Sequence, residues 1–128
     1  MTEPAVTFTD FTLEFGSGRN AVRALDGLTL DVPEGSILGI VGESGSGKST
    51  AGFAAGRLMP QDVRPQSGQL TVLGKDVWAL PIEEMREMRV KDLRYIFQDP
   101  IASLDPTQKI SRQIRDAAPE YISTAEIE

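Results

Sequence analysis

Apolar and polar residues alternate in three short stretches of the N-terminal third of the chain. Residues 6–9, 11–15 and 28–32 each place an apolar side chain at every second position. This period of two is typical of strands that bury one face. Residues 16–20, with the sequence GSGRN, predict a turn between two of these strands.

A different pattern follows at residues 37–41, where ILGIV is almost entirely apolar. Such a run is expected of a strand that is covered on both faces in a parallel sheet. A tight turn at residues 33–35 precedes it. A glycine-rich loop follows it, and then a predicted helix over residues 48–59 that Pro60 ends.

Short elements and turns alternate over the rest of the chain. We expect strands over residues 68–73 and 94–98, and helices over 81–91 and 109–118. Pro81, Glu83 and Glu84 suit the first turn of the earlier helix. The remaining segments are polar or rich in turn residues, and the last of them is acidic and weakly structured: 61–68, 99–106 and 119–128.

Composition narrows the classes of function. The 128 residues amount to about one domain, and 40% hydrophobic with 25% charged residues is ordinary for a soluble protein. The net charge of −6 argues against nonspecific nucleic-acid binding, which needs a basic surface. The chain has no cysteine, which excludes disulfides and thiolate metal sites. It has no histidine either, which excludes the catalytic roles of that residue. Neither a secretory signal nor an apolar run of membrane-spanning length is visible.

The glycine-rich loop fits the phosphate-binding pattern G-x-x-x-x-G-K-[ST], and we call residues 42–49 the P-loop. Backbone N–H groups can surround a polyphosphate only where no Cβ stands in the way, which requires glycine. The following helix directs its N-terminus at the same anion. Lys48 would reach the β- and γ-phosphates, and the Ser49 hydroxyl would reach Mg²⁺.

A linker and a dinucleotide-binding loop both fit this segment less well. A flexible Gly/Ser linker does not usually end in Lys-Ser-Thr or directly follow an apolar strand. A dinucleotide-binding loop needs its glycines in a different order and has no role for the lysine.

Three segments together resemble the ATP-binding subunits of ABC transporters. They are residues 22–50 (VRALDGLTLDVPEGSILGIVGESGSGKST), residues 67–77 (SGQLTVLGKDV) and residues 94–106 (RYIFQDPIASLDP). The last is similar to the family's Q-loop. The sequence of this segment, together with the P-loop sequence GESGSGKS, resembles the corresponding sequences in the branch of the family that imports oligopeptides, dipeptides or nickel. The resemblance covers residues 8–114 and corresponds to the N-terminal portion of such a subunit.

The resemblance implies an α/β fold. It would have a P-loop NTPase-like sheet with an N-terminal antiparallel β subdomain, truncated before the signature and Walker B elements. It divides the chain into β-subdomain strands at residues 1–35, a P-loop core at 36–98, and the Q-loop with the start of a helical subdomain at 99–128.

The resemblance also implies a set of site residues. Phe15 would stack on adenine, where Val22 could contribute to the same surface; simple core packing is the alternative for Phe15. Gln98 would contact Mg²⁺ or the attacking water; the alternative is a solvated glutamine at a strand end. Lys48 and Gln98 are thus the candidate catalytic residues, and Ser49 and Gln98 the candidate Mg²⁺ ligands. The candidate ATP-binding residues are Phe15, Gly42, Glu43, Ser44, Gly45, Ser46, Gly47, Lys48, Ser49 and Thr50.

Several parts of such an ATPase are not found in this sequence. Residues 67–69 only partly imitate the signature, residues 95–99 only partly imitate a Walker B strand, and a switch histidine is absent. We therefore expect the isolated chain to bind ATP weakly, to hydrolyse it negligibly, and to expose strand edges that favour self-association.

The resemblance predicts an ATP-binding subunit, or a fragment of one, that energises import of peptides or a similar small solute. Its partners would be membrane permease subunits and a second ATP-binding subunit, and its place the cytoplasmic face of the cell membrane. A small P-loop kinase or GTPase is one alternative, although no Asn-Lys-x-Asp element for guanine is present. A non-catalytic fragment that pairs with an intact subunit is another.

Overall fold

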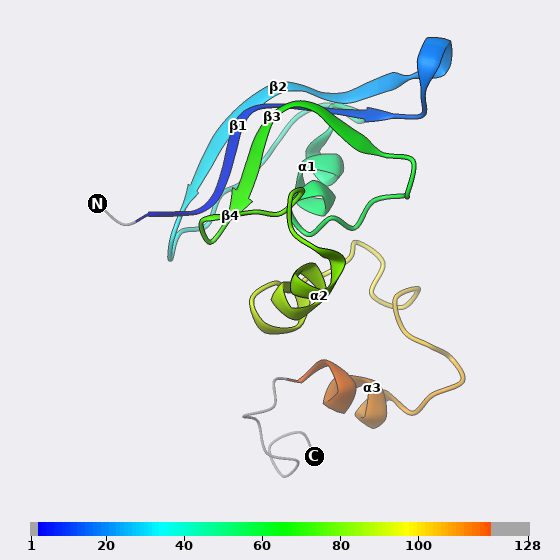
Figure 1. Ribbon diagram of the computed structural model, residues 1–128. Coiled ribbons are helices and arrows are strands. Elements are labelled where there is room, and N and C mark those ends of the chain that lie inside the picture. The colour runs from blue at the N-terminus through cyan, green and yellow to red at the C-terminus, as the bar shows by residue number, and fades with distance from the viewer. Residues whose placement is uncertain (1–2, 119–128) are drawn as a thin grey trace. The chain divides into compact units, whose positions relative to one another are not determined.

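The computed structural model describes residues 3–118, which form two compact units that meet in sequence at Met85 and Arg86. The first unit contains a four-stranded antiparallel sheet and helix α1 (Lys48–Ala55), as Figure 1 shows. The order in the sheet is β2-β1-β3-β4. The strands are β1 (Pro4–Phe15), β2 (Val22–Pro33), β3 (Arg64–Val72) and β4 (Lys75–Asp76).

A long hairpin forms one side of this sheet. The 3-10 turn η1 (Gly18–Asn20) joins β1 to β2 and confirms the turn that the sequence predicts there. The two predicted strands at residues 6–9 and 11–15 are one continuous strand, β1. The predicted strand at residues 28–32 is only the second half of β2. Both strands are longer than predicted because bulges interrupt their alternation.

The bulges keep one row of apolar side chains on a single face of each strand. Phe11, Leu13 and Phe15 alternate on β1, so they share a face. Residues directly opposite each other in an antiparallel pair also share a face. The β2 partners therefore form a matching row although they are three residues apart: Leu28, Leu25 and Val22. We call these six residues the inner row.

Asp10 lies within one of these irregularities, between the pairs Phe8–Leu30 and Phe11–Leu28, with its backbone at φ 47°. Its N–H donates to the hydroxyl of Thr29 on β2 (3.0 Å), which satisfies a group that the bulge leaves unpaired. On the other side of β1, a side chain on Gly68 of β3 would overlap the backbone oxygens of Thr9 and Asp10. Only glycine fits at this point of β3.

The core of the first unit lies between the sheet and α1. Phe11 is central, with its ring 5.8 Å from Phe8 in an edge-to-face arrangement and 6.4 Å from Trp78. The buried apolar side chains come from all of the larger elements: Phe8, Phe11, Leu13, Leu25, Ala51, Ala54, Val63, Leu70, Val72, Val77 and Met85.

Helix α1 ends at Ala55, four residues before the predicted end. Arg57 adopts a left-handed backbone (φ 51°). Its N–H donates to the carbonyl of Ala54 (3.0 Å), and the N–H of Leu58 donates to the carbonyl of Phe53 (2.9 Å). This pair of bonds is a Schellman motif, which ends the helix before Pro60 is reached. The Arg57 side chain then donates to the carbonyls of residues 77 and 80 and lies over the Trp78 ring.

Two predicted strands do not form. Residues 37–41 have no regular secondary structure, and Ile37 and Val41 are almost fully exposed (101% and 94%). Residues 94–98 are likewise irregular, with Ile96 97% exposed. A strand needs a neighbour for its backbone groups, and within residues 3–118 neither segment pairs with another strand. The expected parallel sheet is therefore absent from the described residues.

The second unit has two helices as its regular structure. Helix α2 (Ile82–Lys91) contains the boundary between the units, and helix α3 (Ile110–Ala117) confirms the helix predicted near residue 109. Between them, the Gln113 amide group bonds the backbone N–H and carbonyl of Asp105 (2.8 and 2.9 Å) and so ties α3 to the preceding loop. Hydrogen bonds from Thr107 hold the pKa of Asp105 below its ordinary value.

The prediction for residues 119–128 falls outside the described residues. No helix within residues 3–118 has the length and apolar character needed to cross a membrane.

The contact at Gly68 predicts a large and local loss of stability. In Gly68→Ala the added methyl must displace the backbone of Asp10, so the free energy of unfolding should fall by about 3 kcal/mol or more. Gly74→Ala is the matched control, because Gly74 has the same φ of 75° but nothing within 4 Å of the added carbon. That control should cost only about 1–2 kcal/mol. Equal losses in urea unfolding of the two variants would contradict this account of β3.

Candidate functional site

The P-loop curls tightly between the irregular segment at residues 38–41 and α1. Gly45 and Gly47 have left-handed backbones with φ of 81° and 89°. Within the curl the N–H of Ser46 bonds the carbonyl of Glu43 (3.3 Å), and the N–H of Ala51 bonds the carbonyl of Gly47 (2.9 Å). The loop is therefore a compact turn that leads directly into a helix. This arrangement matches the loop and helix of the strand-loop-helix motif.

Gly47 fixes the loop against the sheet. A Cβ on this residue would lie 2.7 Å from the carbonyl oxygen of Ala24 and 3.1 Å from the Cδ2 atom of Leu25. Such distances leave no room for a side chain, so the loop reaches β2 only because residue 47 is glycine.

The N-terminus of α1 offers unpaired donors to a ligand. Gly47 is the N-cap and has no side chain to bond the first amides, and the first turn contains no acidic residue. The leading N–H groups of a helix lack partners within the helix and carry a partial positive charge. Ser49 and Thr50 belong to this first turn, with Ser49 exposed and Thr50 half-buried.

The Lys48 side chain turns back across the loop. Its Nζ donates to the carbonyl of Gly42 (2.9 Å), to the carbonyl of Glu43 and to the hydroxyl of Ser46 (3.2 Å). The ammonium group therefore lies beside the curled backbone, bound to acceptors that carry no full charge. An anion at this position would offer Lys48 a stronger, charge-assisted hydrogen bond.

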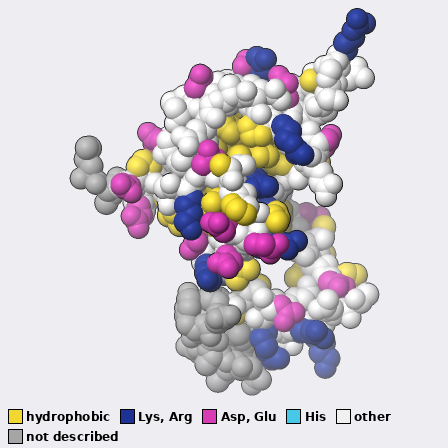
Figure 2. Space-filling view, in the orientation of Figure 1, with side chains coloured by type: hydrophobic (Ala, Val, Ile, Leu, Met, Phe, Trp, Pro, Cys, Tyr) yellow, Lys and Arg dark blue, Asp and Glu magenta, His cyan; other side chains and the backbone are white. Residues whose placement is uncertain are grey.

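A cavity of about 500 Å³ opens beside the P-loop. Leu25 and Leu28 of the inner row line it together with Leu30, residues 38–41 form another wall, and Ser46 and Lys48 supply its polar part. Its walls are otherwise apolar, and hydrophobic side chains are open to view on the face drawn in Figure 2. The site thus combines a cationic, hydrogen-bonding loop with an apolar neighbourhood.

Phe15 and Val22 lie directly opposite each other at the end of the β1–β2 hairpin. Phe15 is half-buried, and Val22 is 64% exposed. Both belong to the inner row, whose next member along β2 is Leu25, the side chain that contacts Gly47. The two residues therefore face the same side of the sheet as the P-loop.

Gln98 belongs to the second unit, whereas the P-loop belongs to the first. It is exposed, and its neighbours Phe97 and Asp99 line a separate cavity of about 400 Å³ with Ala102 and Ser103. The Asp99 carboxylate accepts hydrogen bonds from the N–H groups of Ile101 and Ala102 (3.1 Å each) and so shapes the turn after Gln98.

Within residues 3–118, no three residues of the types His, Cys, Asp or Glu gather where they could hold a metal ion. The oxygen donors of the Ser49 hydroxyl and the Gln98 amide suit a hard cation such as Mg²⁺. Within the first unit, the neutral Ser49 hydroxyl fits a Mg²⁺ ion that arrives with phosphate and keeps several of its waters, as this ion usually does.

Sequence reasoning did not identify the β2 residues that complete the site. Ala24 and Leu25 position Gly47, and Leu28 and Leu30 line the cavity. The spacing of the leucines, three residues and then two, matches neither the period of a regular strand nor that of a helix. The one feature of the sequence that could have indicated these residues is the high density of leucine between residues 25 and 30. The bulges are needed to explain why these leucines share a face.

Comparisons with known proteins agree on one family. A family model described as "ABC transporter" matches residues 25–127, which is most of the chain. The oligopeptide transport ATP-binding protein OppD of Mycobacterium bovis is 52% identical over 85 residues, which are 66% of this chain and 13% of that protein. The probable D,D-dipeptide transport ATP-binding protein DdpD of Escherichia coli is 36% identical over 117 residues, 91% of this chain and 36% of that protein.

Solved structures show the same fold. The dimeric structure of a bacterial ABC transporter cassette superposes with a TM-score of 0.75 at 23% identity, covering 95% of this chain and 52% of that one. The chain therefore spans about half of this cassette and a smaller share of the curated relatives.

The contact between Gly47 and β2 predicts how the loop responds to substitution. In Gly47→Ala the loop must leave Ala24, so the hydrogen-bonded amides of Ser46 and Ala51 should exchange with solvent at least about tenfold faster. Gly45→Ala is the matched control: its φ of 81° is also left-handed, but nothing lies within 4 Å of the added carbon. Hydrogen exchange measured by NMR would show this difference, and equal rates in the two variants would refute the contact's role.

Proposed function

Because the chain belongs to the ABC transporter family, we propose that it binds Mg-ATP through its P-loop as part of an ATP-binding subunit. The observation that carries the proposal is the position of the Lys48 ammonium group across the curled loop, next to the donor end of α1. A lysine, a set of glycine amides and a helix N-terminus together favour the terminal phosphates of a nucleotide.

The residues of the loop have distinct roles in this proposal. Lys48 leaves its carbonyl acceptors and binds the β- and γ-phosphate oxygens, where it stabilises the charge that develops during phosphoryl transfer. The backbone amides of residues 42–50 surround the phosphates, and the small side chains of Ser44, Ser46 and Thr50 leave the approach open. Phe15 provides a flat apolar surface for adenine.

Magnesium would accompany the nucleotide. The Ser49 hydroxyl would be one of its ligands beside the charged phosphates, and the Gln98 amide oxygen keeps the role of candidate ligand that the resemblance implies. The ion supplies charge neutralisation between the phosphates when bound. The positioning of the phosphates remains the task of Lys48 and the loop amides.

The names of the relatives support peptide import as the process that ATP binding serves. Relatives from two organisms are called oligopeptide or D,D-dipeptide transport ATP-binding proteins. We propose that this chain acts likewise with membrane permease subunits at the inner face of the cell membrane, and pairs with a second ATP-binding subunit. The solved dimer of a bacterial cassette supports the pairing. Hydrolysis would require signature and Walker B elements that are not found in these 128 residues.

Removal of the lysine tests the proposal directly. Lys48→Ala deletes a charge-assisted interaction worth about 1.5–3 kcal/mol, so the affinity for Mg-ATP should fall about tenfold or more. The measurement is isothermal titration calorimetry, or displacement of a fluorescent ATP analogue where binding is weak.

Lys75→Ala is the matched control, because Lys75 is an exposed lysine on β4 and its loss changes the net charge equally. Its affinity for Mg-ATP should stay within about twofold of the unsubstituted chain. A chain that binds no Mg-ATP, or two variants that lose affinity equally, would refute the proposed function.

A further inference from the structure

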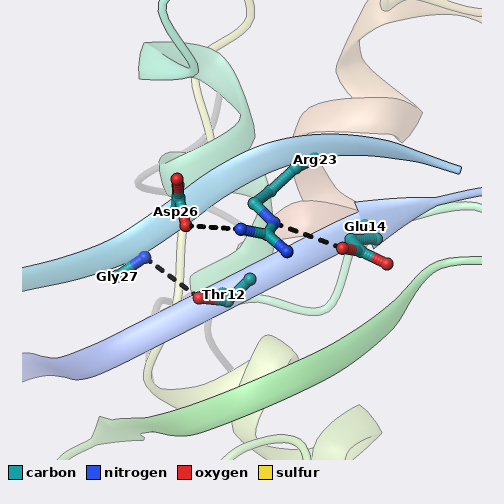
Figure 3. A network of polar contacts seen from close by, with 5 residues as sticks. All are labelled: Thr12, Glu14, Arg23, Asp26 and Gly27. Carbon is teal, nitrogen blue, oxygen red and sulfur yellow. Dashed lines mark hydrogen bonds and ion pairs between the residues drawn. The ribbon is translucent and has the colours of Figure 1, made fainter.

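Arg23 links the two strands of the β1–β2 hairpin and also bridges two positions on β2, as Figure 3 shows. Its Nε donates to the Oε1 atom of Glu14 (3.2 Å), and its Nη1 donates to the Oδ1 atom of Asp26 (3.0 Å). The planar guanidinium fork can hold both carboxylates at once, which a lysine cannot do in the same way. These bonds raise the pKa of Arg23 above its ordinary value, and the bond to Glu14 has the largest effect.

The bridge to Asp26 spans a β-bulge. Leu13 pairs with Leu25 and the next residue, Glu14, pairs with Arg23, so Ala24 is one extra residue on β2. On a regular strand, residues three apart point to opposite faces. The extra residue brings Arg23 and Asp26 to the same face, where the ion pair joins them across the bulge.

The same bulge decides which way Val22 points. Leu25 contacts Gly47 of the P-loop, and without an extra residue Val22 would point to the opposite face from Leu25. With the bulge, Val22 lies opposite Phe15 and both share the inner face with Leu25. Bulges are known devices for turning a side chain toward a site.

We propose that Arg23 is a positioning residue for the nucleotide base: it holds the bulge at Ala24 and thereby turns Phe15 and Val22 toward the P-loop side of the sheet. This inference rests on the proposed function, because a base is present there only if the P-loop binds a nucleotide. Phe15 and Val22 then form a flat apolar surface, next to the phosphate site, for a planar base.

The strength of the bridge fits a local role. The side chains of Arg23 and Asp26 are 53% and 74% exposed, whereas that of Glu14 is 20% exposed. Exposed ion pairs contribute little to global stability. The sheet also has other ties near this point, such as the Gly27 N–H that donates to the Thr12 hydroxyl (3.0 Å, Figure 3). Loss of the bridge should therefore loosen the end of the hairpin and leave the sheet folded.

The test compares Mg-ATP with magnesium tripolyphosphate, which carries the phosphates without a base. For each variant we take the ratio of the two dissociation constants from calorimetry. In Arg23→Gln the preference for ATP should fall about two- to fivefold, while tripolyphosphate affinity should stay unchanged. Asp26→Asn keeps the shape of the side chain and should shift the ratio in the same direction, and Arg23→Lys should restore part of it.

Arg19→Gln is the matched control, because Arg19 is an exposed arginine of η1 and its loss changes the net charge equally. Its ratio should equal that of the unsubstituted chain. Circular dichroism checks that each variant is folded, and the isosteric Asp26→Asn decides the matter if Arg23→Gln does not fold.

The outcomes separate this inference from the proposed function. If the chain binds tripolyphosphate as tightly as it binds ATP, the proposed P-loop function stands and the base surface is refuted. A ratio that Arg23→Gln and Asp26→Asn leave unchanged would refute the positioning role, as would an equal loss for both ligands. A chain that binds neither ligand would refute the proposed function, and the base surface with it.

Discussion

The candidate site depends on one close approach, that of Gly47 to the backbone of β2. The P-loop follows an irregular segment, so its position cannot come from a strand that precedes it. It comes instead from Gly47, which lies against Ala24 and Leu25, and from α1, which continues from the loop and packs Ala51 and Ala54 into the core. The sheet thus holds the loop from the side, and the conformation of Lys48 follows from that placement.

Sequence patterns predicted two kinds of element correctly: turns and helix starts, whose signals are local, and parts of β1, β2 and β3, whose apolar residues alternate. The glycine turn before α1, the start of α2 directly after Pro81 and the position of α3 depend on residues close in sequence, and they form as expected. The strands over residues 37–41 and 94–98 were wrong because an apolar run specifies burial but not a partner for its backbone.

For the site, the sequence predicts a chemistry, but it does not predict the surroundings of the P-loop. The order of glycines with Lys48 and Ser49 predicts a phosphate-binding loop from the sequence alone, because few other structures need those residue types in that order. The roles of Ala24, Leu25 and Arg23 could not be predicted, since they depend on two extra residues that reverse the alternation of β2. Tertiary pairing creates those bulges, and no pattern within β2 reports them.

The bulges of the hairpin also bear on how related sequences should be aligned. Between Leu28 and Val22, each extra residue inverts the face of everything beyond it, and the two inversions cancel. A relative that lacks one residue here would present its outward side chains to the P-loop side of the sheet, whereas a relative that lacks both would keep the inner row. A one-residue gap in this hairpin is therefore a larger evolutionary change than a two-residue gap, although common alignment penalties rank them the other way.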